Sequence, residues 1–554
     1  MGITIIGGNA RYLSELPQFQ DGLPHGIVNK TKTDVGGTYV AANCRYNYII
    51  VCPFRDLVDS IAADKNNRYD VFKCYGGVRE YQFQKYIKEH EIYKIAVTYD
   101  SLEKLLRWMD NETDGWKLPV DEYHLILEDM DFRESAIMAM CRAIQSFKHY
   151  TFLSATPIDE DYEIDFFKSL PHYRVTWEQG QQINIKKIKA TNLTKGVCNI
   201  IKIFCDEGIS LPDINGEVRE VEQLFVFLNS VTTIKQVVES LELDKNEVKI
   251  CCASKQRNRL ILGEYQIESA IAPNKRINFF TKKCFQGCNL FSNNALVIVA
   301  SDAYRTQTLV DISTTMEQIS GRLRCNDKYQ NVFRNTMVHI YSTNNNVLTD
   351  EEFALKMQKK EEDAAMLLSL QEKATDEERE ALIRRVNVET DLLSIEEGYL
   401  VRNEMKSKAF IRKQEIRKAY KDGIWLRNTY NKSEKFIQTK QELWRDFDVL
   451  LAKAVTISYE QLLKDYLDHP SEQFEIEYPE FKDIKRYLKE TEMNSCRWNK
   501  EKMMKKVEDN KKLQQAFRAI YQRGAFYSNE EMKQLLAEQF QRLDIALSPK
   551  VTQI

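Results

Sequence analysis

Short apolar runs alternate with helical segments in this chain, and the alternation occurs twice. In the first third the runs of strand character are residues 26–29, 48–52, 94–98 and 150–153. A second series follows after about residue 175, at residues 224–227, 248–251, 277–280, 295–299 and 337–341. Strands that alternate with helices predict parallel sheets covered by helices. The sequence therefore predicts two α/β domains in tandem.

The rest of the chain has a different character. A chain of 554 residues is too long for one hydrophobic core, and its 43% hydrophobic and 29% charged residues are ordinary for a globular protein. Gly and Pro become scarce from about residue 346, where charged helical segments dominate. Residues 350–386 are typical of one or two solvated helices. We therefore expect four parts: 1–172, 173–345, a charged helical connector at 346–400, and a helical C-terminal domain at 401–554, a candidate for nucleic-acid or partner binding.

Several classes of protein fit poorly. No apolar stretch of about 18 residues is present, so we expect no membrane span, and the first residues lack the pattern of a secretory signal. The 12 cysteines are scattered, which favours free thiols in a reducing cytoplasm over a disulfide scaffold. Residues 401–554 carry a net charge of +7 against −3 for the whole chain, which indicates a basic C-terminal region.

A glycine pair follows the first strand, just before a helix-like segment. Gly36 and Gly37 allow backbone N–H groups to face phosphates, and the hydroxyl of Thr38 is placed to hold Mg²⁺. The phosphate-loop pattern, however, has a lysine where Gly37 stands. Lys30 or Lys32, at the start of the loop, would have to supply the ammonium group. A plain strand–turn–helix connection is the alternative.

Two acidic segments compete as the catalytic carboxylates. In the first, DEYH, Asp121 would hold Mg²⁺, Glu122 would activate the attacking water, and His124 would link the nucleotide site to the second domain. The second is EDMD at residues 128–131. We favour the first because its residue types and order fit the chemistry, and residues 116–120 can form the preceding strand. A solvated acidic turn is the alternative for either.

Two later segments complete the pattern. Ser154 and Thr156 end a strand about 30 residues after the acidic motif, where their hydroxyls can bond its carboxylate or histidine. Gln318 and Arg322 lie one helical turn apart on one face. Arg322 and Arg324 suit phosphate recognition, because arginine stays charged and forks onto phosphate oxygens. Ordinary surface arginines are the alternative.

In this order and spacing, the motifs resemble those of superfamily 2 helicases of the DExH type. The resemblance covers residues 25 to about 345. The matching segments are residues 31–38 for motif I, 52–55 for Ia, 98–102 for Ib, 121–124 for II, 154–156 for III, 227–230 for IV, 281–287 for V and 318–324 for VI. It implies two tandem RecA-like P-loop NTPase domains with ATP and Mg²⁺ between them, and it assigns Gly287 to the nucleotide site. Two departures are Gly37 at the lysine position and Cys325 at the usual place of the last motif VI arginine.

The same resemblance implies a binding path for one nucleic-acid strand. Such motors hold the sugar–phosphate backbone through motifs Ia, Ib, IV and V. The matching positions are Arg55, Thr98, Ser101, Ser230 and Thr281. Residues 402–440 interleave cations with aromatic rings, a composition that suits nucleic acid but also suits an amphipathic helix with a buried aromatic side.

Shorter strings carry two closer resemblances. LSELP at residues 13–17, the loop motif and DEYH resemble helicase-like proteins of crAss-like phages of gut Bacteroidales, and the motif layout is similar to that of herpesvirus origin-binding helicases. Together these imply a nucleic-acid-dependent ATPase, a helicase or translocase. Its partners would be single-stranded or duplex DNA, with RNA left open, and replication proteins. It would act in replication, recombination or repair, in the host cytoplasm if phage-encoded. The alternatives are a non-hydrolysing scaffold, because of Gly37, and a duplex translocase that does not unwind.

Overall fold

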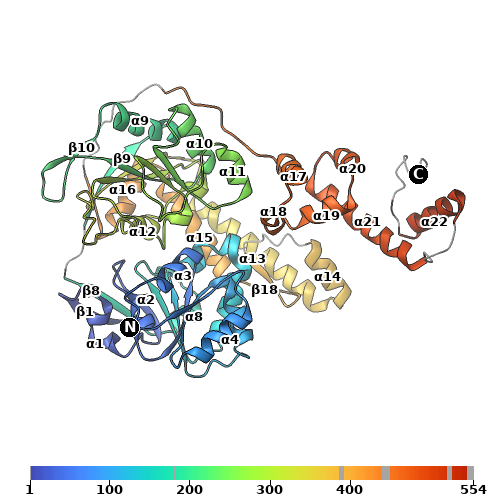
Figure 1. Ribbon diagram of the computed structural model, residues 1–554, viewed down its shortest axis with the longest axis horizontal. Helices are drawn as coiled ribbons and strands as arrows, with labels where there is room; N and C mark the ends of the chain where they lie inside the picture. The colour runs from blue at the N-terminus through green and yellow to red at the C-terminus, as the bar shows by residue number, and fades with distance from the viewer. Residues whose placement is uncertain are drawn as a thin grey trace. The chain divides into compact units, whose positions relative to one another are not determined.

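The computed structural model describes residues 2–178, 182–385, 392–439, 449–520, 527–543 and 545. The chain divides into two compact units (Figure 1). The large unit comprises Met1–Cys252 with Glu268–Ala452, and the small unit comprises Ala253–Ile267 with Lys453–Ile554. The large unit contains two parallel sheets, each with its own helices, which we call the first and the second lobe.

The first lobe is built on an eight-stranded sheet whose strands pair in parallel, in the order β1-β8-β2-β7-β6-β3-β5-β4. Its strands are β1 (Ile3–Gly8), β2 (Gly26–Asn29), β3 (Asn47–Cys52), β4 (Val71–Cys74), β5 (Lys94–Thr98), β6 (Trp116–Asp121), β7 (His149–Ser154) and β8 (His172–Trp177). Its helices are α1 (Pro17–Gln20), α2 (Gly37–Asn43), α3 (Arg55–Ala62), α4 (Glu80–Glu89), α5 (Leu102–Trp108), α6 (Leu125–Glu128), α7 (Met130–Ile144) and α8 (Asp165–Lys168).

The central strands of this sheet explain why it forms. β3 and β5 are buried along almost their whole length, as expected for strands covered by helices on both faces. Pro119 lies inside the central strand β6, although proline cannot donate a ladder hydrogen bond. The pairing of β6 with β3 is correspondingly interrupted between Tyr48 and Val51, while its pairing with β7 runs on through Pro119. The acidic motif therefore begins at the carboxyl end of a central strand.

The second lobe has a seven-stranded parallel sheet in the order β13-β14-β12-β15-β16-β9-β19. Its strands are β9 (Ile183–Lys189), β12 (Gln223–Phe227), β13 (Val248–Cys251), β14 (Ile277–Phe280), β15 (Ala295–Ser301), β16 (Thr336–Tyr341) and β19 (Phe436–Gln438). Its helices are α9 (Leu193–Asp206), α10 (Val231–Ser240) and α12 (Thr315–Ser320), and a hairpin is formed by β10 (Ser210–Pro212) and β11 (Val218–Glu220). The last strand, β19, comes from beyond residue 401 and pairs with β9 at the sheet edge.

The segment after the second lobe is mainly helical. It contains α13 (Asp350–Lys373), α14 (Asp376–Arg385), β17 (Leu393–Glu396), β18 (Tyr399–Arg402), α15 (Glu404–Ala419) and α16 (Gly423–Asn431). α15 packs against α6 and α7 of the first lobe, and Tyr420 just beyond it donates a hydrogen bond to the Val310 carbonyl of the second. The strand order and these helices confirm the predicted fold class of two tandem RecA-like α/β domains followed by a mainly helical region.

Residues 402–439 of the basic stretch belong to the packed structure of the large unit. The side chains of Arg412 and Tyr420 are buried, and the ring of Phe410 stacks on Phe353 with centroids 5.4 Å apart. Trp425 is 44% exposed. Most of the aromatic and cationic groups that suggested a nucleic-acid surface therefore serve internal contacts, as in the amphipathic-helix alternative.

The small unit is helical and has its own core. Its helices are α11 (Gln256–Leu262), α17 (Tyr459–Asp468), α18 (Glu472–Glu477), α19 (Glu480–Tyr487), α20 (Glu490–Ser495), α21 (Lys500–Ile520) and α22 (Asn529–Arg542). Leu463, Phe481, Ile484 and Met503 are fully buried in this core, and Leu260 of α11 packs against it. Across the described ranges of the chain, no helix has both the length and the apolar character needed to cross a bilayer.

Candidate active site

The loop between β2 and α2 is held by its neighbouring strands. The Lys30 amide donates to the Ser154 carbonyl at 2.8 Å, and the Trp177 indole donates to the Lys30 carbonyl at 2.9 Å. Thr31 and Asp34 adopt the left-handed region with φ of 50° and 66°, and Gly36 follows with φ of 80°. Left-handed backbone is unfavourable for residues other than glycine, so the contacts with β7 and β8 hold the loop in a conformation that its sequence alone does not favour.

Lys30 fills the space beside Gly37. A Cβ atom at Gly37 would lie 3.4 Å from Cδ of Lys30 and 3.3 Å from Cδ1 of Leu153. The Lys30 ammonium reaches the acidic motif, where Nζ lies 3.3 Å from Oδ1 of Asp121, and the residue is only 7% exposed. Lys32 takes another course, with its ammonium 5.9 Å from the centre of the Trp177 ring. Of the two candidate lysines, Lys30 is therefore the one whose ammonium lies against the acidic motif.

Asp121 and Glu122 are both buried beside this ammonium group. Burial raises the pKa of Asp121 even though Lys30 opposes the shift. Burial also acts to raise the pKa of Glu122, but Lys30, His124 and the two arginines of the second lobe outweigh it and lower the pKa. Burial would lower the pKa of Lys30, and the two carboxylates raise it instead. Glu122 stays ionised as a result, and its backbone φ of 50° marks a strained position.

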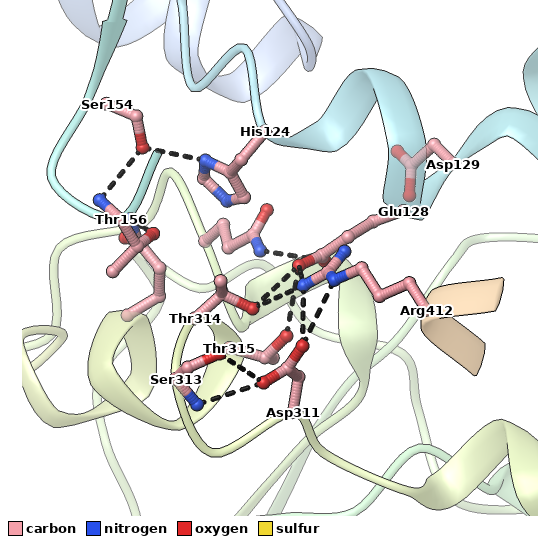
Figure 2. Close-up of polar contacts among 12 residues, drawn as sticks. His124, Glu128, Asp129, Ser154, Thr156, Asp311, Ser313, Thr314, Thr315 and Arg412 are labelled. Atoms are coloured by element: carbon pink, nitrogen blue, oxygen red, sulfur yellow. Dashed lines mark hydrogen bonds and ion pairs between the residues drawn. The ribbon is translucent and has the colours of Figure 1, made fainter. Parts of the chain in front are cut away.

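A hydrogen-bonded chain joins Glu122 to both lobes. His124 lies with Nδ1 2.8 Å from Oγ of Ser154 and 3.5 Å from Oε2 of Glu122. The amide of Thr156 donates to the same Ser154 hydroxyl at 2.9 Å (Figure 2). From the second lobe, the Gln318 side-chain amide donates to Glu122 at 3.2 Å and to the Thr156 hydroxyl at 2.9 Å. Residues that the sequence places almost 200 positions apart therefore meet at one carboxylate.

The two arginines reach the site in different ways. Arg322 donates from Nη2 to Oε1 of Gln318 at 2.9 Å and from Nε to the Gln318 carbonyl at 2.9 Å. Arg324 crosses to the phosphate loop, where Nη1 lies 3.2 Å from Oγ1 of Thr33 and 3.7 Å from Oδ2 of Asp34. Burial, together with repulsion from Arg322, lowers the pKa of Arg324 to about 10. Arg324 thus contacts the phosphate loop of the first lobe, whereas the hydrogen bonds of Arg322 are with Gln318 and Cys288 of the second lobe.

A cavity of about 1460 Å³ opens beside these groups. Residues of both lobes and of α16 line it, among them Thr31, Thr33, Gly321, Arg324 and Trp425. This volume exceeds the range of about 300–1,000 Å³ that is typical of small-ligand sites. The cavity can therefore admit a ligand of nucleotide size beside residues 31–34 and Arg324, whereas Lys30, Asp121 and Glu122 do not line it.

The donor set of the site suits magnesium. Thr38 is the second residue of α2, and its hydroxyl and the Asp121 carboxylate are the hard oxygen ligands that this ion takes. In the part of the chain that the structure describes, no group of three or more His, Cys, Asp or Glu side chains is arranged around one point. Mg²⁺ usually binds through one or two carboxylates together with substrate phosphates, and Asp121 would be the carboxylate here. Gly287, with φ of 72°, has the Phe54 ring of motif Ia as its neighbour.

The candidate nucleic-acid positions differ in exposure. Arg55 begins α3 and is exposed. Thr98, Ser101, Ser230 and Thr281 are each less than a tenth exposed. Two of these hydroxyls are engaged, since Ser230 caps α10 and Thr281 donates to a backbone carbonyl at 3.4 Å. Of these five residues, Arg55 is therefore the one whose side chain is open to a nucleic-acid strand.

Some residues of the site were not expected from the sequence. The competing acidic segment lies away from Lys30, and its Glu128 contacts Arg412 of α15, while Asp129 pairs with Lys282 of the second lobe. The hydroxyl of Thr33 accepts a hydrogen bond from Arg324. In the sequence, only the position of Thr33 within the phosphate loop could have indicated this contact. Arg412 lies in a stretch that is basic throughout, so nothing in the sequence distinguishes it from its neighbours.

Comparisons with known proteins show no family for this chain. No family model and no curated protein matches the chain. Among solved structures, the DEAD-box helicase Mss116 bound to single-stranded RNA and UDP-BeF is 13% identical, with 68% of this chain and 83% of that chain covered and a TM-score of 0.38. A DEAD box protein from Methanococcus jannaschii is 15% identical, covering 58% and 84%, with a TM-score of 0.29. The Escherichia coli DExH-box NTPase HrpB is 14% identical, covering 60% and 41%, with a TM-score of 0.35.

Proposed function

We propose that this chain is a nucleic-acid-dependent ATPase, a helicase or translocase of the DExH type. One observation carries the proposal: the Lys30 side chain fills the space beside Gly37 and brings its ammonium to the acidic motif. Gly37 is the main departure from a phosphate-binding loop, and Lys30 supplies from seven residues earlier the cation that the loop lacks. We propose residues 1–172 and 173–345 as the two motor domains, although β8 continues the first sheet to Trp177.

In this proposal the residues of the two lobes have separate roles. Lys30 and the amides at Gly36 and Gly37 would bind phosphate oxygens. Thr38 and Asp121 would hold Mg²⁺, which when bound neutralises phosphate charge. Glu122, whose pKa is lowered, would orient the attacking water and accept its proton.

The second lobe would complete the site only when it lies against the first. Arg322 and Arg324 would stabilise charge that develops on the transferred phosphoryl group. Gln318 contacts Glu122 and Thr156 of the first lobe, so these hydrogen bonds would form only when the two lobes are closed. Opening and closing of the two lobes would then move a strand along Arg55 and the segments that carry Thr98, Ser101, Ser230 and Thr281.

The biological setting rests on the sequence resemblances alone. We propose DNA, single-stranded or duplex, as the substrate, with RNA tested in parallel. The closer resemblances to helicase-like proteins of crAss-like phages and to herpesvirus origin-binding helicases support a role in replication, recombination or repair of a phage or mobile element. Replication proteins would be partners, and the cytoplasm of the host the expected compartment.

A non-hydrolysing nucleic-acid-binding scaffold is the second candidate. It is favoured by Gly37 itself, because a protein that has lost hydrolysis has no need of a lysine at that position. Against it stands the buried Glu122 carboxylate, whose contacts with Gln318 and His124 bring the two lobes together. Keeping a buried carboxylate ionised costs free energy, which a scaffold could avoid with a neutral side chain.

Steady-state ATP hydrolysis separates the two candidates. The full chain is assayed with Mg²⁺, with and without single-stranded DNA or RNA, beside Glu122→Gln and Lys30→Ala. A motor shows turnover that the strand stimulates and that both substitutions lower by about 100-fold or more. Lys32→Ala, the matched lysine of the same loop, should stay near the wild type. Tight strand binding without turnover in any of these proteins would favour the scaffold.

A further inference from the structure

Glu128 collects hydrogen-bond donors from both lobes. Its side chain is 6% exposed. Oε1 accepts from the hydroxyls of Thr314 at 3.1 Å and Thr315 at 3.3 Å, and Oε2 accepts from the Gln286 amide at 3.3 Å. All three donors belong to the second lobe, whereas Glu128 ends α6 of the first. This carboxylate, which the sequence offered as an alternative catalytic acid, is therefore a contact point between the lobes.

Arg412 completes the contact from a third segment. It lies on α15, after β16 in the sequence, and is 8% exposed. Nη2 donates to Oε1 of Glu128 at 2.9 Å, to Oδ2 of Asp311 at 2.8 Å and to the Thr314 hydroxyl at 2.6 Å (Figure 2). A buried guanidinium group is tolerated only where its charge is paired and its N–H groups are satisfied. Here one carboxylate comes from each lobe, so the pairing depends on both lobes being in place.

A small cavity links this cluster to the acidic motif. Its volume is about 20 Å³, and its lining includes His124, Tyr162, Thr314 and Arg412. Nε2 of His124 is buried and has no hydrogen-bond partner within the described residues. A cavity of this volume has room for one water molecule. Since Nδ1 of the same ring faces Ser154 and Glu122, His124 lies between the nucleotide site and the Arg412 cluster.

We propose that Arg412 is a positioning residue for nucleotide hydrolysis, which fixes the closed arrangement of the two lobes by holding Glu128 against Asp311 and Thr314. Thr314 directly precedes α12, the helix that carries Gln318. Holding Thr314 therefore sets where Gln318 meets Glu122, and His124 lies between the two clusters. This inference rests on the proposed function, since it names the element that keeps the same site assembled.

The chain offers a matched control. Lys413, the next residue along α15, forms an ion pair with Asp131 of the first lobe. Lys413→Gln removes a cation from the same helix and leaves the Arg412 cluster untouched. Arg412→Gln removes the bridge, Arg412→Lys keeps its charge, and Thr314→Val makes a milder change by deleting the hydroxyl between Arg412 and Glu128.

The test measures kcat and KM for strand-stimulated ATP hydrolysis by the full chain. Arg412→Gln should lower kcat by about tenfold or more and change KM less, because the closed arrangement matters most in the transition state. Thr314→Val should lower kcat in the same sense, Arg412→Lys should recover part of the loss, and Lys413→Gln should stay within about twofold of the wild type. Equal losses in Arg412→Gln and Lys413→Gln, or Thr314→Val with the wild-type kcat, would overturn the proposal.

Hydrogen exchange provides a second readout that needs no turnover. In the nucleotide-free chain, Arg412→Gln should speed amide exchange in residues 121–129 and in residues 311–322, that is, in both lobes. Lys413→Gln should not affect residues 311–322. If the wild type does not hydrolyse ATP but Arg412→Gln still speeds exchange in both lobes, the proposed function is refuted and the contact between the lobes stands. Strand-stimulated hydrolysis with unchanged kcat and exchange in Arg412→Gln would refute the positioning role alone.

Discussion

At the scale of single residues, the lysine of the phosphate loop comes from a different position in this chain. A phosphate loop has its lysine at the start of the helix, where this chain has Gly37. Lys30 comes from the end of β2 instead, and its aliphatic part passes 3.4 Å from the position of the missing Cβ atom. A side chain at position 37 would start in contact with both Lys30 and Leu153. We therefore interpret Gly37 as the consequence of Lys30 and not as the loss of a function.

This interpretation predicts a rescue. Lys30→Ala should lower kcat/KM for ATP by about 100-fold, and the double variant Lys30→Ala/Gly37→Lys should regain about tenfold, because a lysine at position 37 then finds the space free. Gly37→Lys alone should unfold at a lower temperature than the wild type, since two side chains would compete for one volume. The assays are steady-state kinetics and thermal unfolding. A double variant no better than Lys30→Ala would show that the two positions are not interchangeable.

The sequence could predict the members of the site but not all of its contacts. Asp121, Glu122, Gln318 and Arg322 were expected together, because motif order and strand ends limit where each can lie. Arg412 could not be found in this way. It contacts residues more than 100 and more than 280 positions earlier, and no local pattern records such a pairing.

At the scale of elements, burial determines which strands can be predicted from the sequence. Central strands such as β3 and β5 are continuous apolar runs, and the sequence predicted them. The strands that it did not predict lie toward the sheet edges. β1 alternates between buried and exposed positions, β8 has a single buried residue, and β19 is only three residues long, so their apolar runs are too short to stand out.

One buried histidine joins α15 and α16 to the second sheet. His339 of β16 is fully buried, with Nδ1 2.8 Å from the Tyr430 hydroxyl and Nε2 3.1 Å from the Ser301 hydroxyl. Burial lowers its pKa to about 3, and the nearby Lys187 acts in the same direction. The folded chain therefore keeps this ring neutral at pH values where an unfolded chain would protonate it.

The histidine predicts a loss of stability in mild acid. The ordinary pKa of histidine is about 6.5, so between pH 6.5 and 3 the unfolded state binds a proton that the folded state does not. Stability is full above pH 6.5 and falls below it, by about 2 kcal/mol at pH 5. Urea unfolding of the wild type between pH 7.5 and 5 should show this slope. His339→Gln should be less stable at pH 7.5 and show a flatter profile, and an equal slope in both proteins would assign the acid sensitivity elsewhere.

At the scale of the whole molecule, the chain does not divide where its composition changes. The expected helical domain at residues 401–554 contains segments of two kinds. Residues up to Ala452 belong to the large unit, in which β19 extends the second sheet and α15 carries Arg412. Residues from Lys453 belong to the small unit, together with the α11 segment that leaves the second lobe between β13 and β14. Composition is helical and charged on both sides of Ala452, so it contains no signal for this division.

The division predicts two unfolding transitions in the full chain, because each unit has its own core. Under the proposed function, nucleotide binds only to the large unit. ADP with Mg²⁺ at about 100 times its Kd should stabilise that unit by roughly 2.7 kcal/mol. In scanning calorimetry the transition with the larger enthalpy should then move to higher temperature while the smaller one stays in place. A single transition that moves as a whole would mean that the two units unfold as one. Movement of the smaller transition alone would place the nucleotide in the small unit and contradict the assignment of the site.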